Sequence, residues 1–370
     1  MNTKYPVELY DTYLFDSPMP LTNSFTAPAT KHLLFAMRAG SSSNNLNMAA
    51  DLQKTKVLIE NQQIGIYFGA VILAIAFALL TPATTALAAG INWALAFMLF
   101  VTFLQVPIID LGQSFTQFRF LTALLITNFI VLPLFVILLI QLLPADPVLQ
   151  FGVLLVLLAP CIDYVITFSY IGRADARLLL AATPALLVAQ MLLLPLYLGI
   201  FLGEATSRLI HPEPFIHALI WLIVTPLLLA GLVQRWATHF EAGKQVSMAL
   251  GILPVPATAL VLFIVFAAVV PQLGLAIEVV ITVIPFYVAF AAIAPLIGWQ
   301  IGRLFQLNTA AGRAIAFSAG TRNSLVVLPL AFAVPGGFPA LPALIVTQTL
   351  VELLCELIYV RLIPKLSSRP

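Results

Sequence analysis

Long apolar segments, separated by only a few polar residues, run through this chain from residue 64 to residue 362. A helix needs about 20 predominantly apolar residues to cross the hydrocarbon core of a bilayer. The chain as a whole is 61% hydrophobic and 9% charged, whereas soluble domains carry about 25% charged residues. So large an apolar surface needs lipid around it, and we therefore predict an all-α polytopic membrane protein.

The apolar segments divide into ten predicted transmembrane helices. They are 64–81, 91–110, 120–143, 148–170, 177–203, 215–235, 246–270, 276–301, 312–335 and 339–362. Residues 1–63 are polar and rich in Ser, Asn and Thr, and we predict a disordered cytoplasmic tail there. The remaining predicted parts are a first set of five helices over 64–203, a second set over 204–364 and a cytoplasmic end over 365–370.

Basic residues gather on one side of the predicted membrane when the N-terminus is taken as cytoplasmic. The cytoplasmic loops and flanks then carry Lys54, Lys56, Arg119, Arg173, Arg177, Arg235, Lys244, Arg303, Arg313, Arg361, Lys365 and Arg369, and the opposite side carries only Arg208. Cytoplasmic loops are enriched in Lys and Arg. We therefore predict that both termini are cytoplasmic, and we expect the membrane to be a bacterial inner membrane.

Two short sequences recur at similar distances along the chain. Pro184–Gln190 is repeated as Pro342–Gln348, and Leu99–Phe103 as Leu262–Phe266. Each half of the membrane region then holds five helices, and because five is odd the second half enters the membrane upside down. Inverted repeats are typical of secondary transporters. Chance similarity among apolar residues is the alternative. The two terminal glutamines of the first pair are expected to bond across helices.

Four charged residues lie away from the ends of the predicted helices: Asp163, Arg322, Glu352 and Glu356. Charges inside a bilayer usually face the interior of a helix bundle or a cavity. Asp163 follows Pro160 in the fourth helix, and Arg322 follows Gly320 in the ninth. Proline and glycine both interrupt helices, and broken helices at membrane depth occur where they line a cavity or are buried in protein. The two predicted breaks therefore mark a candidate substrate site.

Asp163 and Arg322 have two interpretations. They form a structural ion pair that holds the two halves together, or they line the substrate site together with Asn323. In the second case the guanidinium is suited to anchoring an anionic substrate.

Glu352 and Glu356 are one turn apart and therefore share a face of the tenth helix. Two carboxylates at membrane depth repel each other, so at least one is expected to carry a proton. Such a pair suits coupling to protons or a proton relay. The alternative is that Glu356 lies near the cytoplasmic end and pairs with Arg361.

Several functional classes receive no support from the sequence. It contains no HExxH motif and no P-loop, its basic residues are scattered singly, and its two cysteines have no zinc spacing. The histidines, which are His32, His211, His217 and His239, lie in the tail, in loops or at a helix edge. We predict no enzyme activity, metal centre, cofactor or nucleic-acid partner. A membrane receptor or channel is the alternative of another class, although a channel needs a continuous polar face.

Around the two predicted breaks the sequence resembles the bile acid:sodium symporter superfamily, which includes the arsenite permeases. The resemblance covers residues 64–364 and is strongest in Pro160–Asp175 and Ala316–Ser324. It implies ten helices in two inverted five-helix repeats. It also implies that helices four and nine unwind and cross at the substrate site.

The sodium-coupled branch of that superfamily differs from this chain at the compared positions. It has a Ser-Asn pair where Val165 and Ile166 stand, and a glutamate and a glutamine where Ser318 and Arg322 stand. Sodium needs several oxygen ligands, and a guanidinium repels a cation, so sodium coupling is not expected.

The arsenite branch has a cysteine where Cys161 stands, and a thiolate is a soft ligand suited to trivalent arsenic. That branch also has a glutamate in helix nine where Leu325 stands. We predict a secondary active transporter, with arsenite-like metalloid efflux as the favoured activity. A sodium-independent organic anion carrier is the first alternative. The expected substrate-binding residues are Cys161, Asp163, Arg322 and Asn323, and the expected partners are a small solute and the lipid bilayer.

Overall fold

The computed structural model describes residues 43–105, 118–207, 213, 216–217, 219–332, 334 and 340–367. The chain separates into two compact units, Met1–Asp51 and Leu52–Pro370. In the described ranges the regular structure is helical and no strand is present, apart from one isolated bridge between Pro160 and Arg322. The predicted all-α class is therefore confirmed for these residues.

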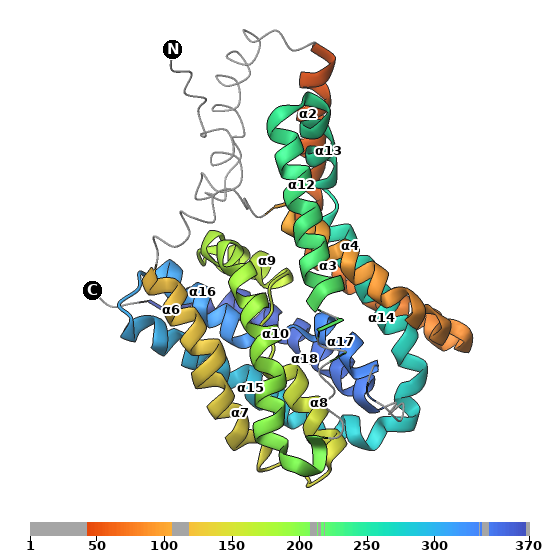
Figure 1. The fold of residues 1–370 in the computed structure, drawn as a ribbon, viewed down its shortest axis with the longest axis vertical. Coiled ribbons are helices and arrows are strands. Elements are labelled where there is room, and N and C mark those ends of the chain that lie inside the picture. Colours follow the sequence, from red (N-terminus) through yellow and green to blue (C-terminus); the bar gives the residue numbers. More distant parts are fainter. Residues whose placement is uncertain are drawn as a thin grey trace. The chain divides into compact units, whose positions relative to one another are not determined.

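The described helices are drawn in chain order from red to blue in Figure 1. They are α2 (Ser43–Asn61), α3 (Gln63–Leu80), α4 (Ile91–Phe103), α6 (Phe118–Ile126), α7 (Leu132–Ile140), α8 (Pro147–Leu157), α9 (Tyr164–Ile171), α10 (Ala176–Ser207), α12 (Thr225–His239), α13 (Glu241–Leu250), α14 (Pro254–Leu273), α15 (Ile277–Leu304), α16 (Thr309–Gly320), α17 (Ser324–Phe332) and α18 (Ala340–Leu362). Short π-helices, Thr127–Val131 and Leu219–Val224, join α6 to α7 and precede α12.

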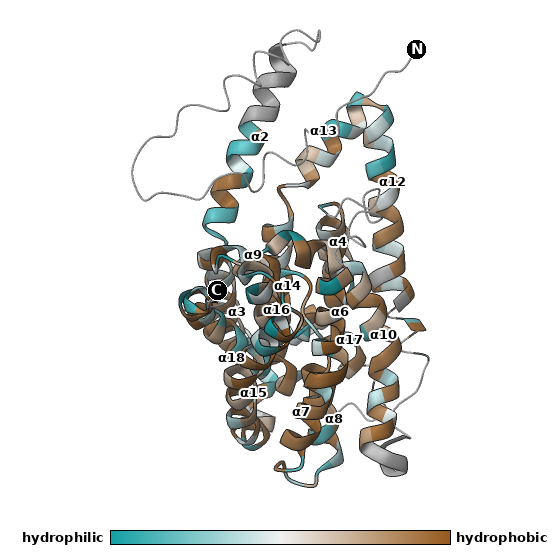
Figure 2. Cartoon of the chain, turned by 90° about the vertical axis from the view of Figure 1, so that its left-hand side faces the viewer, coloured by the Kyte–Doolittle hydropathy of each residue, from teal (hydrophilic) through white to brown (hydrophobic). Residues whose placement is uncertain are grey.

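Within the described ranges, eight helical segments are long and apolar enough to cross a membrane. They are Gln63–Leu80, Ala83–Phe103, Phe118–Ile140, Ala176–Phe201, Ile220–His239, Pro254–Leu273, Ile277–Leu304 and Ala340–Lys365. Each overlaps one of the ten predicted spans. The other two predicted spans, 148–170 and 312–335, are each interrupted: α8 and α9 form the first and α16 and α17 the second. Figure 2 shows hydrophobic residues along most of these helices and hydrophilic ones on α13.

Two predicted boundaries differ from the structure. The seventh span was expected to begin at residue 246, but residues up to Leu250 belong to α13, and α14 begins at Pro254 because proline fits the first turn of a helix. The disordered tail was expected to reach residue 63, whereas Ser43–Asn61 are helical, with Lys56 and Glu60 3.7 Å apart one turn from each other. Residues 1–42 of that predicted tail lie outside the described residues.

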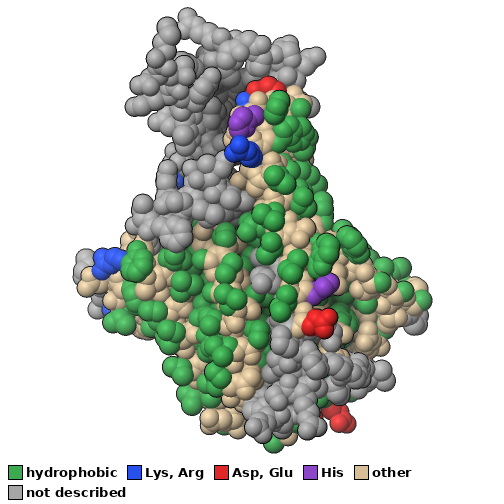
Figure 3. Space-filling view, viewed as in Figure 1, with side chains coloured by type: hydrophobic (Ala, Val, Ile, Leu, Met, Phe, Trp, Pro, Cys, Tyr) green, Lys and Arg blue, Asp and Glu red, His purple; other side chains and the backbone are tan. Residues whose placement is uncertain are grey.

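Helix α18 lies among several others and packs against α8, α14, α15 and α17. Helix α15 packs closely along α16: a Cβ on Gly298 would lie 2.8 Å from the carbonyl oxygen of Ile315. Small residues allow such close approach between membrane helices. Hydrophobic side chains are spread over the described part of the face seen in Figure 3, with charged groups at only a few places. The buried face of α18 is therefore held among helices, while apolar side chains face outward.

Candidate functional site

The first interrupted helix is ended by proline and restarted by a carboxylate. Helix α8 ends at Leu157, close before Pro160, because the residue before a proline is disfavoured in the helical conformation. Helix α9 begins at Tyr164, whose backbone N–H donates to Asp163 Oδ1 at 2.5 Å. The carboxylate therefore satisfies one of the free N–H groups at the start of α9.

The second interruption follows the last residue of α16, Gly320. A Cβ there would lie 2.7 Å from Pro295 Cγ and 2.8 Å from the ring of Tyr359. Only glycine fits at this packing distance. The chain is extended at Thr321, and α17 begins at Ser324.

The two interruptions meet and are joined through their backbones. Cys161 N–H donates to the carbonyl oxygen of Thr321 at 3.1 Å, and Asn323 N–H donates to that of Ala159 at 2.7 Å. These bonds form the antiparallel bridge between Pro160 and Arg322. We call residues 158–163 and 321–323 together the crossing. The structure thus brings Pro160, Cys161, Asp163, Arg322 and Asn323 into one place.

Arg322 is fully buried, with 0% of its surface exposed, and its guanidinium turns back onto the ends of two helices. Nη1 donates to the Leu157 carbonyl of α8 at 3.3 Å, and Nη2 donates to the Ser318 and Ala319 carbonyls of α16 at 2.6 and 2.8 Å. Nη2 also donates to Asn128 Oδ1 at 2.9 Å. Helix C-termini carry partial negative charge, so the guanidinium compensates both at once.

Asp163 does not pair with Arg322, and the structural ion pair considered above is wrong. In the described residues Asp163 Oδ1 accepts from Tyr164 N–H and from the thiol of Cys161 at 3.1 Å, and Oδ2 has no hydrogen-bond partner. The physical reason is that the guanidinium of Arg322 already donates hydrogen bonds to backbone carbonyl groups and to a side-chain amide oxygen. Cys161 is buried beside the carboxylate.

Glu352 lies against the crossing and accepts three hydrogen bonds. The Tyr164 hydroxyl donates to Oε1 at 2.5 Å, and Arg322 backbone N–H and Gln348 Nε2 each donate to Oε2 at 2.6 Å. A group that receives three donors is suited to being an ionised carboxylate. Glu352 therefore joins α18 to both interruptions.

Glu356 is fully buried and its Oε1 lies 2.5 Å from the Thr321 hydroxyl. In the described residues no ion pair joins it to Arg361, which is exposed at the end of α18. The alternative pairing with Arg361 is therefore wrong, because Glu356 faces inward and Arg361 faces outward.

The two glutamines contact the second interruption from different helices. Asn323 Nδ2 donates to Gln190 Oε1 of α10 at 3.3 Å, and the Ser324 hydroxyl donates to Gln348 Oε1 of α18. Gln190 and Gln348 do not bond to each other among these contacts, but each bonds to a neighbouring segment.

Three polar residues at this site were missed by the sequence analysis: Tyr164, Thr321 and Ser324. Each is the residue next to a charged or amide residue that was identified, so adjacency to a break was the available signal. Their hydroxyl groups connect the crossing to Glu352, Glu356 and Gln348 of α18.

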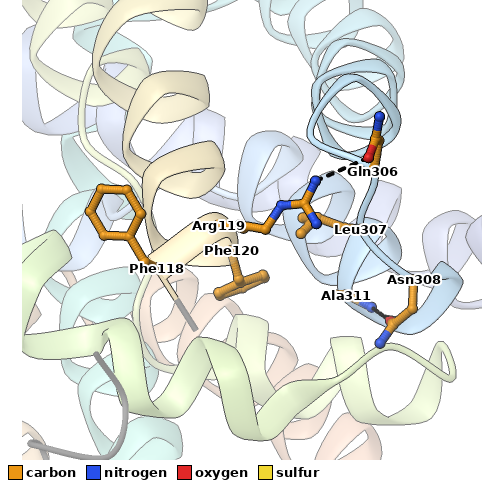
Figure 4. Close-up of a pocket in the computed structure, with 7 residues that line it drawn as sticks. All are labelled: Phe118, Arg119, Phe120, Gln306, Leu307, Asn308 and Ala311. Atoms are coloured by element: carbon orange, nitrogen blue, oxygen red, sulfur yellow. Dashed lines mark hydrogen bonds between the residues drawn. The ribbon is translucent and has the colours of Figure 1, made fainter. Parts of the chain in front are cut away.

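A shallow pocket of about 250 Å³ lies elsewhere (Figure 4). It is lined by Phe118, Arg119, Phe120, Gln306, Leu307, Asn308 and Ala311, with Arg119 donating to Gln306 at 3.1 Å. Ala311 is in the first turn of α16 and the crossing follows its last, about 13 Å away at 1.5 Å per residue. The pocket is therefore not part of the crossing, whose side chains are buried.

Comparison with known families identifies the chain. Residues 92–280 match the model of the Sodium Bile acid symporter family, which is just over half of the 370 residues. The chain belongs to this family. No curated protein matches it. Membership confirms the resemblance noted in the sequence, and together with the apolar helices it makes the protein an integral membrane transporter.

Proposed function

We propose that the protein is a sodium-independent secondary transporter that moves a small solute past the crossing. The observation that carries this proposal is the position of the Arg322 guanidinium on the C-terminal carbonyls of both α8 and α16. Carbonyl oxygens gathered in this way suit a cation. Here the cation is covalently part of the protein, so a bound sodium ion would have to displace it.

We further propose that ten membrane segments form two inverted repeats. Pro133 leaves the carbonyl of Phe129 without its helical N–H partner, and the Tyr197 hydroxyl of α10 donates to that carbonyl. Pro295 does the same to Ala291, whose carbonyl accepts from Tyr359 of α18. Each proline lies 162 residues from its counterpart, and so does each tyrosine. Repeated proline–tyrosine pairs at one offset support a duplicated five-helix unit.

The burial of side chains at the crossing also supports an alternating-access mechanism. The side chains of Cys161, Asp163 and Asn323 are all buried. A solute reaches them only after the helices around the crossing move. Such movement is the normal behaviour of transporters with two repeats.

The favoured solute is a trivalent metalloid such as arsenite, moved outward. The Cys161 thiol lies 3.1 Å from Asp163 Oδ1, and Asp163 Oδ2 has no partner among the described residues. When the thiol binds arsenous acid, the S–H and one As–OH bond break, an S–As bond forms, and the proton leaves with hydroxide as water. No oxidation is involved. Asp163 is placed to take the thiol proton and pass it to the departing hydroxide.

An organic anion is the second candidate because the positive charge of Arg322 is not balanced by a carboxylate in contact with the guanidinium among the described residues. No carboxylate lies within ion-pair distance of its guanidinium in the described residues, and Nε has no hydrogen-bond partner. A positive group without a negative partner attracts an anion. In this case Arg322 and Asn323 would bind the substrate, and Cys161 would be a packing residue.

Transport in proteoliposomes tests both proposals. Arsenite flux should be equal with sodium and with choline as the external cation, and strict sodium dependence would overturn the first proposal. Cys161→Ser should abolish arsenite flux while leaving the amount of folded protein unchanged. For an organic anion the pattern inverts: Cys161→Ser is silent, and Arg322→Lys is severe because an ammonium lacks the paired donors of a guanidinium.

A further inference from the structure

The two buried glutamates of α18 differ in their surroundings, although they are one turn apart. Glu352 receives three donors, which are a hydroxyl, a backbone N–H and an amide N–H. In the described residues Glu356 has one hydrogen-bond partner, the Thr321 hydroxyl, and its Oε2 has none. Both are at most 2% exposed. The two side chains are therefore equally buried, and they differ only in the number of hydrogen-bond donors around each carboxyl group.

The hydrogen atoms around Thr321 can be counted. Its Oγ1 lies 2.7 Å from the carbonyl oxygen of Phe317 and 2.5 Å from Glu356 Oε1. A hydroxyl group has one hydrogen, and a carbonyl oxygen only accepts. If Thr321 donates to Phe317, the contact with Glu356 is a hydrogen bond only when Glu356 carries the proton and donates it to Thr321 Oγ1.

The ionised form of Glu356 would be poorly stabilised by its surroundings. It would have at most one donor, while burying a carboxylate without a partner is costly. The titratable groups that interact with it from α18 are Glu352, Cys355 and Tyr359, and none of these is a cation. Of the packed neighbours, α8, α14 and α17 have no titratable residue. Helix α15 buries Tyr287 and carries Glu278 in its first turn and Arg303 in its last turn, and α9 contributes Tyr164 to Glu352. Arg322 donates its backbone N–H to Glu352, and its guanidinium donates to the carbonyl groups at the ends of α8 and α16.

We propose that Glu356 is the proton-binding site of this transporter and that Glu352 is a fixed anion that holds the crossing to α18. The proposal deepens the expected proton-relay role of this pair and rests on the proposed sodium-independent transport. It assigns different roles to the two carboxyl groups.

Proton release then changes the contact between α18 and the crossing. Protonated Glu356 donates to Thr321, which donates to Phe317, so every hydrogen has an acceptor. After release, two acceptors compete for the single Thr321 hydrogen, and a second negative charge lies one turn from Glu352. Both changes favour separation of Thr321 from α18. Loss of one proton is thereby coupled to movement of the second interrupted helix.

Infrared spectroscopy tests the proton site without any substrate. The full chain in lipid bilayers should show a carboxylic acid C=O band at neutral pH that is lost in Glu356→Gln and kept in Glu352→Gln. A band unchanged by Glu356→Gln overturns the proposal, and so does loss of the same band in Glu352→Gln. If Glu356→Gln does not fold, Thr321→Val should shift the band to higher frequency because the acid loses its acceptor, and Thr321→Ser should leave it in place. No shift in Thr321→Val also overturns the proposal.

Flux measurements separate this proposal from the proposed substrate. With arsenite as the probe in sodium-free proteoliposomes, Glu356→Gln should keep arsenite–arsenite exchange and lose the acceleration produced by a pH gradient. A variant still accelerated like the parent overturns the proton-binding role. Absence of arsenite flux in the parent contradicts the substrate instead, and the infrared band then decides the proton site by itself.

Discussion

Replacement of Arg322 by methionine tests whether the guanidinium holds the crossing together. The substitution removes four hydrogen bonds, which join the side chain to three carbonyl groups and to Asn128 Oδ1. Hydrogen bonds between membrane helices are worth about 0.6 kcal/mol each, which brings the four to about 2.4 kcal/mol. The guanidinium also lies 5.3 Å from the ring centre of Phe290, a contact worth about 1 kcal/mol.

Methionine also removes the cost of burying a charge, which works in the opposite direction. Replacing both members of a buried ionic contact by apolar groups is often neutral, but removing one member costs about 3–5 kcal/mol because its partner is left unsatisfied. Here the partners are mostly backbone carbonyls, which no substitution can remove. We therefore expect Arg322→Met to lower the free energy of unfolding by about 3 kcal/mol. Arg322→Lys should cost about half as much, because an ammonium keeps the charge but lacks the fork that reaches both α8 and Asn128.

Reversible unfolding in mixed micelles is the assay, with helical circular dichroism as the signal. A double-mutant cycle with Asn128→Ala provides the internal check, since residues in contact show coupling energies of about 0.5 kcal/mol or more. If the methionine variant is as stable as the parent, or if the cycle shows no coupling energy, the guanidinium does not stabilise the crossing.

Three other outcomes are expected. Gly298→Ala should lower stability by about 1–3 kcal/mol because its Cβ would lie 2.6 Å from that of Ala319, whereas Gly65→Ala, with nothing within 4 Å, should be close to neutral in the same mixed-micelle unfolding assay. Tyr197→Phe should cost about 1 kcal/mol by leaving the carbonyl of Phe129 unpaired; no change would refute this role. Reporter fusions after residues 85, 145, 208, 273 and 337 should all indicate the outer face, and two cytoplasmic signals would contradict the ten-segment topology.

The helices and their interruptions could be predicted from the sequence because proline, glycine and long apolar runs determine the conformation of the segment in which they lie. The family is confirmed, and so are eight long apolar helices in the part of the chain that the structure describes; the chain is interrupted beside Pro160 and Gly320. The start of α14 was missed because the C-terminal end of α13, from Val246 to Leu250, is mostly apolar and continues the pattern before Pro254.

The contacts of the charged residues were much less accessible. Arg322 and Asp163 were paired in one interpretation because only side chains of opposite charge were compared, whereas the guanidinium bonds mainly to backbone carbonyls. A carbonyl group is present at every residue and leaves no trace in a sequence. The contact between Tyr164 and Glu352 spans 188 positions, and nothing in either local sequence indicates the other.

The backbone bonds of the crossing have a consequence for how such a protein diverges. The two hydrogen bonds that join the interrupted helices use the N–H groups of Cys161 and Asn323 and the carbonyls of Ala159 and Thr321. None of these bonds depends on a side chain. Substitutions at residues 161 and 323 can therefore change the chemistry presented to a solute while the helices stay joined. Substrate selectivity can therefore change during evolution while the backbone hydrogen bonds of the crossing are kept.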